Sequence, residues 1–184
     1  MSIAVQEHLR LFGDVIDEEM RLNEPGQMVQ RVWRELPERF STIELDQFVV
    51  MPNHVHAIIL INQSPPPHPR GHPSSVREPL VGTHGHEAPE TPAVYAGAPP
   101  AARRIALGDV IGAYKSLTTV QYIRGVRNRH WPPFPGRLWQ RNYYEHVVRS
   151  EESLLKIREY IRYNPRLWTL DPENPLPGDL PVLP

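Results

Sequence analysis

Alternating apolar side chains predict a β-hairpin in the first third of the chain. Residues 43–51 and 54–61 are rich in β-branched and aromatic side chains, and the turn-forming pair Pro52 and Asn53 separates them. A hairpin buries one face of each strand, so this pair is expected to form part of the core. Two shorter β-type segments are further candidate strands, at residues 3–5 and 143–148.

Helical spacing of apolar residues predicts three helices, at 26–36, 105–123 and 151–163. The last has Ser150 as its N-cap and must end before Pro165, because proline disfavours helix at the residue that precedes it. The resulting order, β-α-β-β-α-β-α, is that of an α+β ferredoxin-like sandwich with an antiparallel sheet and an added C-terminal helix. We therefore expect one core shared by both halves of the chain.

Proline content marks two segments that are not expected to contribute to this core. Residues 63–102 contain ten of the 22 prolines and few apolar side chains, which is typical of a disordered insertion. Residues 169–184 form a second proline-rich segment, expected to be a loose tail. The chain is thus interpreted as a single domain over residues 1–168, interrupted by the insertion and followed by the tail.

Composition excludes several classes of protein. No apolar run approaches the roughly 20 residues of a membrane-spanning helix, so no membrane partner is expected. The absence of cysteine excludes a disulfide framework and a thiolate metal site. No nucleotide-binding motif is present, so no nucleotide cofactor is expected. These features favour a cytoplasmic protein.

Charge is distributed unevenly, although the net charge is only −1. Residues 1–62 carry 5 basic and 10 acidic side chains, whereas residues 103–166 carry 13 basic and 5 acidic ones. Aromatic side chains are interleaved with the basic ones, a composition typical of surfaces that bind nucleic acids. The alternative is a solvated basic face that pairs with the acidic half.

Two histidines at the start of the predicted strand 54–61 are candidate metal ligands. Side chains alternate along a strand, so His54 and His56 project from the same face and can share one ion. A His-x-His pattern alone is more often structural. His84 and His86 have the same spacing inside the proline-rich insertion, where nothing is expected to hold them rigid. The strand is what favours His54 and His56.

The helix predicted at 151–163 supplies a phenol and an amide on one side. Tyr160 borders its apolar stripe, and Asn164 follows one turn later on the same side. Taken alone, these residues are better explained as a boundary aromatic and a helix C-cap. The stripe that should face the sheet consists of Leu154, Ile157 and Ile161.

Three segments together resemble a known family. FVVMPNHVHAIILI, WQRNYYEHVVR and LLKIREYIRYNP are similar to motifs of the REP-associated tyrosine transposases, a branch of the single-tyrosine HUH transposases, in the same order. The resemblance covers most of residues 8–168 outside the insertion. It implies a ferredoxin-like fold, with Tyr160 as nucleophile and His54, His56 and Asn164 as ligands of Mg²⁺ or Mn²⁺.

The same resemblance implies an activity on single-stranded or hairpin DNA. Tyr160 would cleave the strand through a 5′-phosphotyrosine link and leave a 3′-hydroxyl that can rejoin it, as a monomer or homodimer. The residues expected to bind DNA are arginines that contact phosphates and tryptophans that stack on bases. They are Arg127, Arg129, Trp131, Arg137, Trp139 and Arg141.

The order of the motifs separates this chain from two related families. Conjugative relaxases place the tyrosine before the histidines, and replication initiators usually carry a lysine where this chain has Asn164. The chain is expected to begin inside the family's first strand, so a catalytically impaired or domesticated repeat-binding protein is the alternative. A metal-dependent hydrolase that uses water as nucleophile is a second alternative.

Overall fold

The computed structural model describes residues 1–62 and 104–175. Contacts divide the chain into one compact unit, made of residues 1–62 and 105–184, and a second unit at 63–104. The predicted insertion at 63–102, with His84 and His86, lies outside the described residues. All elements of the fold named below belong to the first unit.

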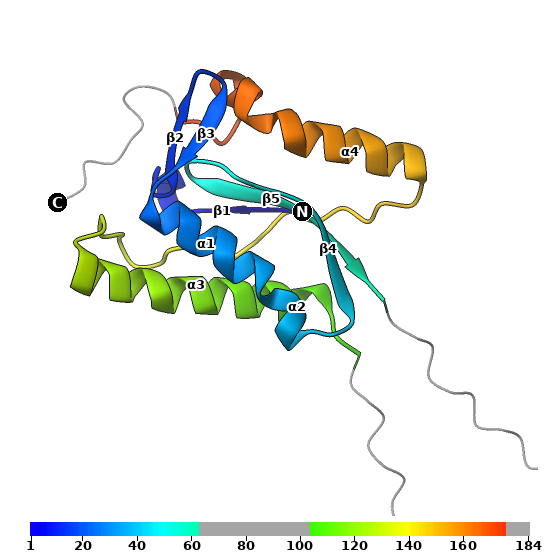
Figure 1. Cartoon of the computed structure of the whole chain (residues 1–184), viewed down its shortest axis with the longest axis horizontal. Helices are drawn as coiled ribbons and strands as arrows, with labels where there is room; N and C mark the ends of the chain where they lie inside the picture. Colours follow the sequence, from blue (N-terminus) through cyan, green and yellow to red (C-terminus); the bar gives the residue numbers. More distant parts are fainter. Residues whose placement is uncertain (63–103, 176–184) are drawn as a thin grey trace, which may run out of the picture. The chain divides into compact units, whose positions relative to one another are not determined.

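A three-stranded antiparallel sheet forms the centre of this unit (Figure 1). Its order is β1 (Ser2–Ala4), β5 (His54–Ile61), β4 (Ile43–Val50). The hairpin of β4 and β5 and the short first strand are confirmed, and the sheet with its helices confirms the α+β class. The finer ferredoxin-like arrangement stays a prediction.

The strand predicted at 143–148 is not formed. Two isolated bridges join residues 139–144 to the segment that contains β1: Ser2 pairs with Tyr144, and Val5, the residue after β1, pairs with Trp139. Between them, the carbonyl groups of residues 140–142 accept hydrogen bonds from Nζ of Lys115 instead of extending a ladder. A three-residue β1 offers too few partners for a regular strand, although the segment still lies beside it.

Helices cover the two faces of the sheet (Figure 1). The helices α1 (Glu24–Arg34) and α3 (Leu107–Arg129) pack together on one face, and α4 (Glu151–Tyr163) contacts β4 and β5 on the other. The core lies between the sheet and α1 with α3. Its largest fully buried side chains include Trp33, Tyr114, Tyr122, Phe12 and Ile3.

Local interactions explain where these helices begin and end. Oδ1 of Asn23 accepts the amide of Gly26 at the start of α1, and Oγ of Ser150 accepts that of Ser153 at the start of α4. α3 continues to Arg129, beyond the predicted end at residue 123, and stops at His130 in the left-handed conformation.

Several elements were not predicted. A second hairpin joins β2 (Gly13–Ile16) to β3 (Glu19–Leu22) through Asp17 and Glu18, both at positive φ. Its turn lacks the Asn or Gly that usually signals this geometry. The shorter elements are α2 (Leu36–Arg39) and the 3₁₀ helices η1 (Gln6–His8) and η2 (Asn164–Leu170).

The segment after residue 168 differs from the expected loose tail over its described part. η2 extends to Leu170, and Asn174 bonds both to the Trp168 carbonyl and to the Arg10 guanidinium. Arg10 also lies over the Trp168 ring, 5.4 Å from its centroid. Residues 169–175 therefore pack against the unit. No helix in the described ranges is long and apolar enough to cross a membrane.

Candidate active site

His54 and His56 project from the face of β5 that α4 covers, opposite to Val55 and Ala57 in the core. Their Nε2 atoms lie 3.0 Å apart, and the rings meet edge to face with centroids 4.6 Å apart. His54 is fully buried and His56 is 9% exposed. The hairpin turn at residues 51–53 and the pairing of both strands hold the two imidazoles rigidly.

Asn53 selects the tautomer of His54. Its Nδ2 donates to the carbonyl groups of His8 and Glu173, at 3.1 and 2.5 Å, so its Oδ1 is left to accept. That Oδ1 lies 2.8 Å from Nδ1 of His54, which must therefore carry the proton. The lone pair of Nε2 then points toward His56. Metal-binding histidines typically have such an acceptor on the ring nitrogen that does not bind the ion.

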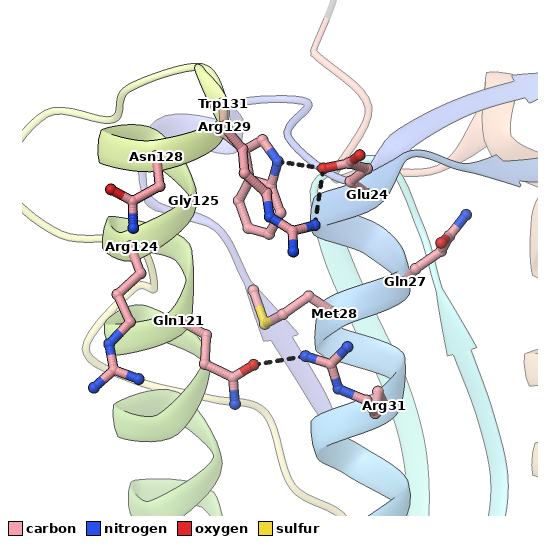
Figure 2. Close-up of a pocket in the computed structure, with 10 residues that line it drawn as sticks. All are labelled: Glu24, Gln27, Met28, Arg31, Gln121, Arg124, Gly125, Asn128, Arg129 and Trp131. Atoms are coloured by element: carbon pink, nitrogen blue, oxygen red, sulfur yellow. Dashed lines mark hydrogen bonds and ion pairs between the residues drawn. The ribbon is translucent and has the colours of Figure 1, made fainter.

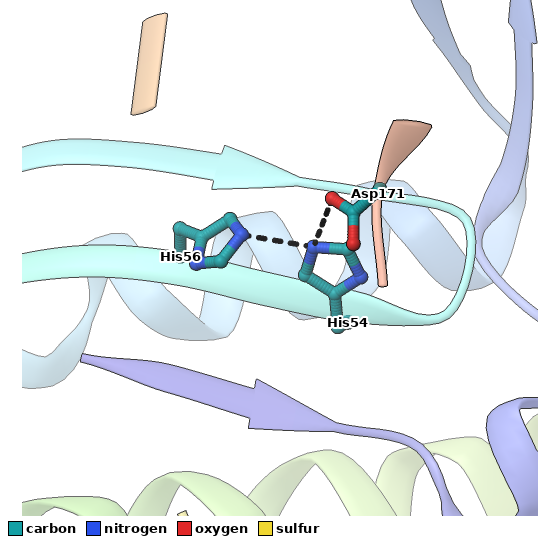
Figure 3. Close-up of side chains that lie close together, drawn as sticks. All are labelled: His54, His56 and Asp171. Carbon is teal, nitrogen blue, oxygen red and sulfur yellow. Dashed lines mark hydrogen bonds and ion pairs between the residues drawn. The ribbon is translucent and has the colours of Figure 1, made fainter. Parts of the chain in front are cut away.

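Asp171 brings a carboxylate to the same point (Figure 3). Its Oδ2 lies 3.7 Å from Nε2 of His54, and its side chain is 3% exposed. Oδ1 accepts the backbone amide of Glu173 at 2.8 Å. The nearest ligand atoms of His54, His56 and Asp171 all lie within 4.8 Å of one another.

Both imidazoles are uncharged at neutral pH. Burial lowers the pKa of His54 to about 4, against a smaller opposing effect of the Asn164 side chain. Burial and the neighbouring His54 lower the pKa of His56 to about 3. Within the described residues, no lysine or arginine pairs with Asp171. A buried carboxylate is costly unless a cation compensates it, and a neutral imidazole does not.

Asn164 contributes an unsatisfied oxygen. The residue is 1% exposed, and its Oδ1 accepts no hydrogen bond of acceptable geometry. The side chain still lies close enough to His54 and Tyr160 to influence the pKa of each. A buried acceptor without a donor is rare in proteins, and it is expected where a cation binds.

These donors suit a divalent metal ion. Two ligands bound at about 2.1 Å and about 90° to each other lie about 3.0 Å apart, which is the separation of the two Nε2 atoms. Two imidazole nitrogens with one or two oxygens are a ligand set that binds divalent metal ions. His54, His56, Asp171 and Asn164 would hold the ion.

Tyr160 lies beside the histidines on α4. Its ring is 5.3 Å from that of His56, edge to face, and the residue is 47% exposed. Burial, and then the negative charge of Asp171, raise the pKa of its phenol. Ile161, the next residue, is buried against the sheet and Leu154 and Ile157 are half-buried, so the predicted stripe does face it.

Tyr163 is engaged elsewhere. The guanidinium of Arg166 lies over its ring, 5.1 Å from the centroid. Among the tyrosines of the described residues, ring contact with the candidate metal ligands is made by Tyr160.

The residues expected to bind DNA divide into two groups. Arg127, Arg137 and Arg141 are exposed, and in the described part of the chain no carboxylate forms an ion pair with them. Arg129 instead pairs with Glu24 at 3.4 Å. A basic surface after residue 124 is therefore accessible.

The two tryptophans predicted to stack on bases, Trp131 and Trp139, both pack against other residues of the protein. Trp139 is buried in the core, and its Nε1 donates to Thr118, so it is not accessible to bases and the expectation of stacking is corrected. Trp131 is half-buried, packs against Tyr122 and donates to Glu24. Packing decided both positions, and no local sequence pattern distinguishes them from exposed aromatics.

Sequence reasoning missed Asn53 and Asp171. Asn53 was interpreted only as a turn residue, although its place directly before His54 is a usable signal. Asp171 falls in the proline-rich segment expected to be a loose tail, and Pro165 interrupts any helical periodicity that would connect it to Asn164.

Comparison with known proteins places the chain in a family. A protein of Haemophilus influenzae described as uncharacterized is 32% identical to it over 164 residues, covering 88% of this chain and 76% of that protein. The chain belongs to the family of this Haemophilus protein. No family model matches the chain.

Proposed function

We propose that this protein cleaves and rejoins single-stranded DNA, including hairpin DNA, as a tyrosine transposase with a divalent metal ion. The observation that supports this most is the position of Tyr160, whose ring lies 5.3 Å from that of His56 at a cluster of buried ligands. The resemblance of the three motifs adds the substrate class. DNA as substrate favours the cytoplasm.

The proposed step is a transesterification. Oη of Tyr160 attacks phosphorus and loses its proton, the bond from phosphorus to the 3′ oxygen breaks, and that oxygen leaves as a hydroxyl after gaining a proton. The phosphotyrosine keeps the phosphodiester's energy, so a 3′-hydroxyl can reverse the step without ATP. The metal ion would orient the phosphate and offset its developing charge.

The surroundings of Tyr160 influence how easily its phenol loses a proton. The phenol of Tyr160 is protonated at neutral pH, as any tyrosine is, and burial and the charge of Asp171 raise its pKa further. Because the charge of Asp171 contributes to that shift, compensation of this carboxylate makes loss of the proton easier. The half-exposed position of Tyr160 leaves room for a DNA strand to reach it.

The decisive experiment is a search for a covalent protein–DNA adduct. Labelled hairpin DNA with single-stranded flanks is incubated with the protein and Mn²⁺, and adducts are separated on denaturing gels. Tyr160→Phe should abolish the adduct, and Tyr163→Phe, the matched control three residues away, should retain it. An adduct with Tyr160→Phe that is missing with Tyr163→Phe would contradict the assignment.

A hydrolase that uses water as nucleophile is the second candidate. It is favoured by Asp171, because two histidines and one carboxylate are a common ligand set for metal-activated water. The same gels decide between the two. Cleavage that survives Tyr160→Phe and yields no adduct supports the hydrolase.

A further inference from the structure

A polar groove lies between α1 and α3, on the face of the sheet opposite to the candidate active site (Figure 2). Its volume is about 410 Å³, within the range of about 300–1,000 Å³ that small-ligand sites usually have. Met28 of α1 and Gly125 of α3 are among its lining residues, and Figure 2 shows Met28 between the two helices.

Trp131 forms a rigid wall of this groove. Its ring packs so closely on α3 that a Cβ at position 125 would come within 2.1 Å of it. Its Nε1 donates to Oε2 of Glu24 at 2.9 Å, and Arg129 pairs with the same carboxylate oxygen at 3.4 Å. The start of α1 and the end of α3 are thus joined at one end of the groove.

Hydrogen-bonding side chains line the rest. Arg31 of α1 donates to Gln121 of α3 at 2.8 Å, which bridges the two helices. Gln121, Arg124 and Asn128 follow at helical spacing on α3. Within the described residues, the side chains of Arg124 and Asn128 have neither a hydrogen-bond nor an ion-pair partner in the protein, so both remain available to a ligand.

The charge of the lining favours an anion. Three arginines, Arg31, Arg124 and Arg129, line the groove with a single carboxylate, Glu24. Arg31 also pairs with Glu35 at 3.6 Å and Arg129 pairs with Glu24, so within the described residues Arg124 is the arginine of the lining whose charge is not compensated. Hydrogen bonds from Trp131 and Arg129 lower the pKa of Glu24, so the carboxylate is ionised. Its negative charge is paired with Arg129 and not directed at a ligand. The guanidinium of Arg124 and the amide of Asn128 are the donors and acceptors that bind a phosphate and a base edge.

We propose that this groove holds a nucleotide of the DNA hairpin, outside the flank that is cleaved, an inference that rests on the proposed function for its choice of ligand. Arg127 is exposed and lies three residues after Arg124 on α3, so it offers a second cation beside the groove, which an extended polyanion can contact and a free mononucleotide does not need. Because the sheet separates the groove from Tyr160, the bound nucleotide belongs to the hairpin and not to the single-stranded flank that is cleaved. The groove binds the hairpin, and α4 faces the flank that reacts.

The test measures binding alone. Tyr160→Phe protein in EDTA is titrated into fluorescein-labelled hairpin DNA, and separately into oligo(dT) of equal length, and anisotropy is recorded at several salt concentrations. The double variant Arg124→Ala, Asn128→Ala should bind the hairpin about tenfold more weakly, with a salt slope reduced by about one, and bind oligo(dT) as before. Arg39→Ala, an exposed arginine of α2 outside the groove, is the control and should bind both probes normally.

Hairpin affinity that stays within twofold of the parent would overturn the inference. If the double variant does not fold, as judged by circular dichroism, photocrosslinking of a hairpin that carries 5-iodo-deoxyuridine to the Tyr160→Phe protein replaces it. Crosslinks should map to the peptides that contain Trp131 or Met28, and crosslinks confined to other peptides would refute the groove. Neither readout needs catalysis, so both test the groove even if the protein forms no covalent adduct with DNA.

Discussion

Oδ2 of Asp171 lies 3.7 Å from Nε2 of His54, and both side chains are withdrawn from solvent. The imidazole is neutral, since burial lowers its pKa to about 4, and so it does not compensate the carboxylate. A divalent cation between the two would satisfy both, and it would also satisfy Oδ1 of Asn164.

We therefore expect Asp171→Asn to weaken Mn²⁺ binding by at least about tenfold, because the change removes the negative ligand and keeps its volume. Isothermal titration calorimetry with Mn²⁺ measures this. Asp14→Asn, an exposed carboxylate on β2, is the control and should bind normally. If both variants bind Mn²⁺ with equal affinity, Asp171 is not a ligand of the ion.

The variant Asn164→Leu tests whether Asn164 binds a metal ion or stabilises the fold. Leucine removes an oxygen that has no donor, so in EDTA the free energy of unfolding should stay equal or rise by about 1 kcal/mol. The stabilisation that Mn²⁺ gives the parent protein should be reduced or lost. Urea denaturation with EDTA and with Mn²⁺ measures both. A large loss of stability in EDTA would show that Asn164 is a structural cap.

Gly125→Ala should destabilise the protein, even though alanine favours helix over glycine by about 1 kcal/mol. The new methyl group would overlap the Trp131 ring, which Glu24 and Tyr122 hold in place, and overpacking of this kind costs about 1–3 kcal/mol. Gly112→Ala in the same helix meets nothing within 4 Å and should be neutral or stabilising. Thermal unfolding midpoints compare the two.

Acid should destabilise the metal-free protein through the histidines. The pKa values of His54 and His56 are lowered to about 4 and about 3 from an ordinary 6.5, so the unfolded chain takes up these protons at a higher pH than the folded one. Stability should be complete above about pH 6.5 and fall toward pH 4, by up to about 1.4 kcal/mol per pH unit for each proton.

Urea denaturation in EDTA at several pH values measures this slope. Replacement of both histidines by glutamine should flatten it over the same range. His130→Gln, at the exposed end of α3, is the control and should leave it unchanged.

Local sequence patterns predict two elements of the candidate site, the β4–β5 hairpin and α4. The hairpin that carries His54 and His56 has alternating β-type side chains and a Pro-Asn turn, and α4 has a capping serine and an apolar stripe. Each signal lies within about 20 consecutive residues, so local physics was enough to put Tyr160 and Asn164 on the correct side of α4. The β2–β3 hairpin has no such signal, because its turn residues are acidic.

Local pattern thus accounts for the β4–β5 hairpin, the three main helices, and the placement of His54 beside His56. Long-range packing, in contrast, brought Asp171 to His54, oriented the Asn53 amide through the carbonyl groups of His8 and Glu173, and buried Trp139. These contacts join segments far apart in the chain, where residue type is the only local clue. An aspartate after a 3₁₀ turn has the same sequence signature whether it is exposed or buried, and the fold decides which by closing the chain over the histidines.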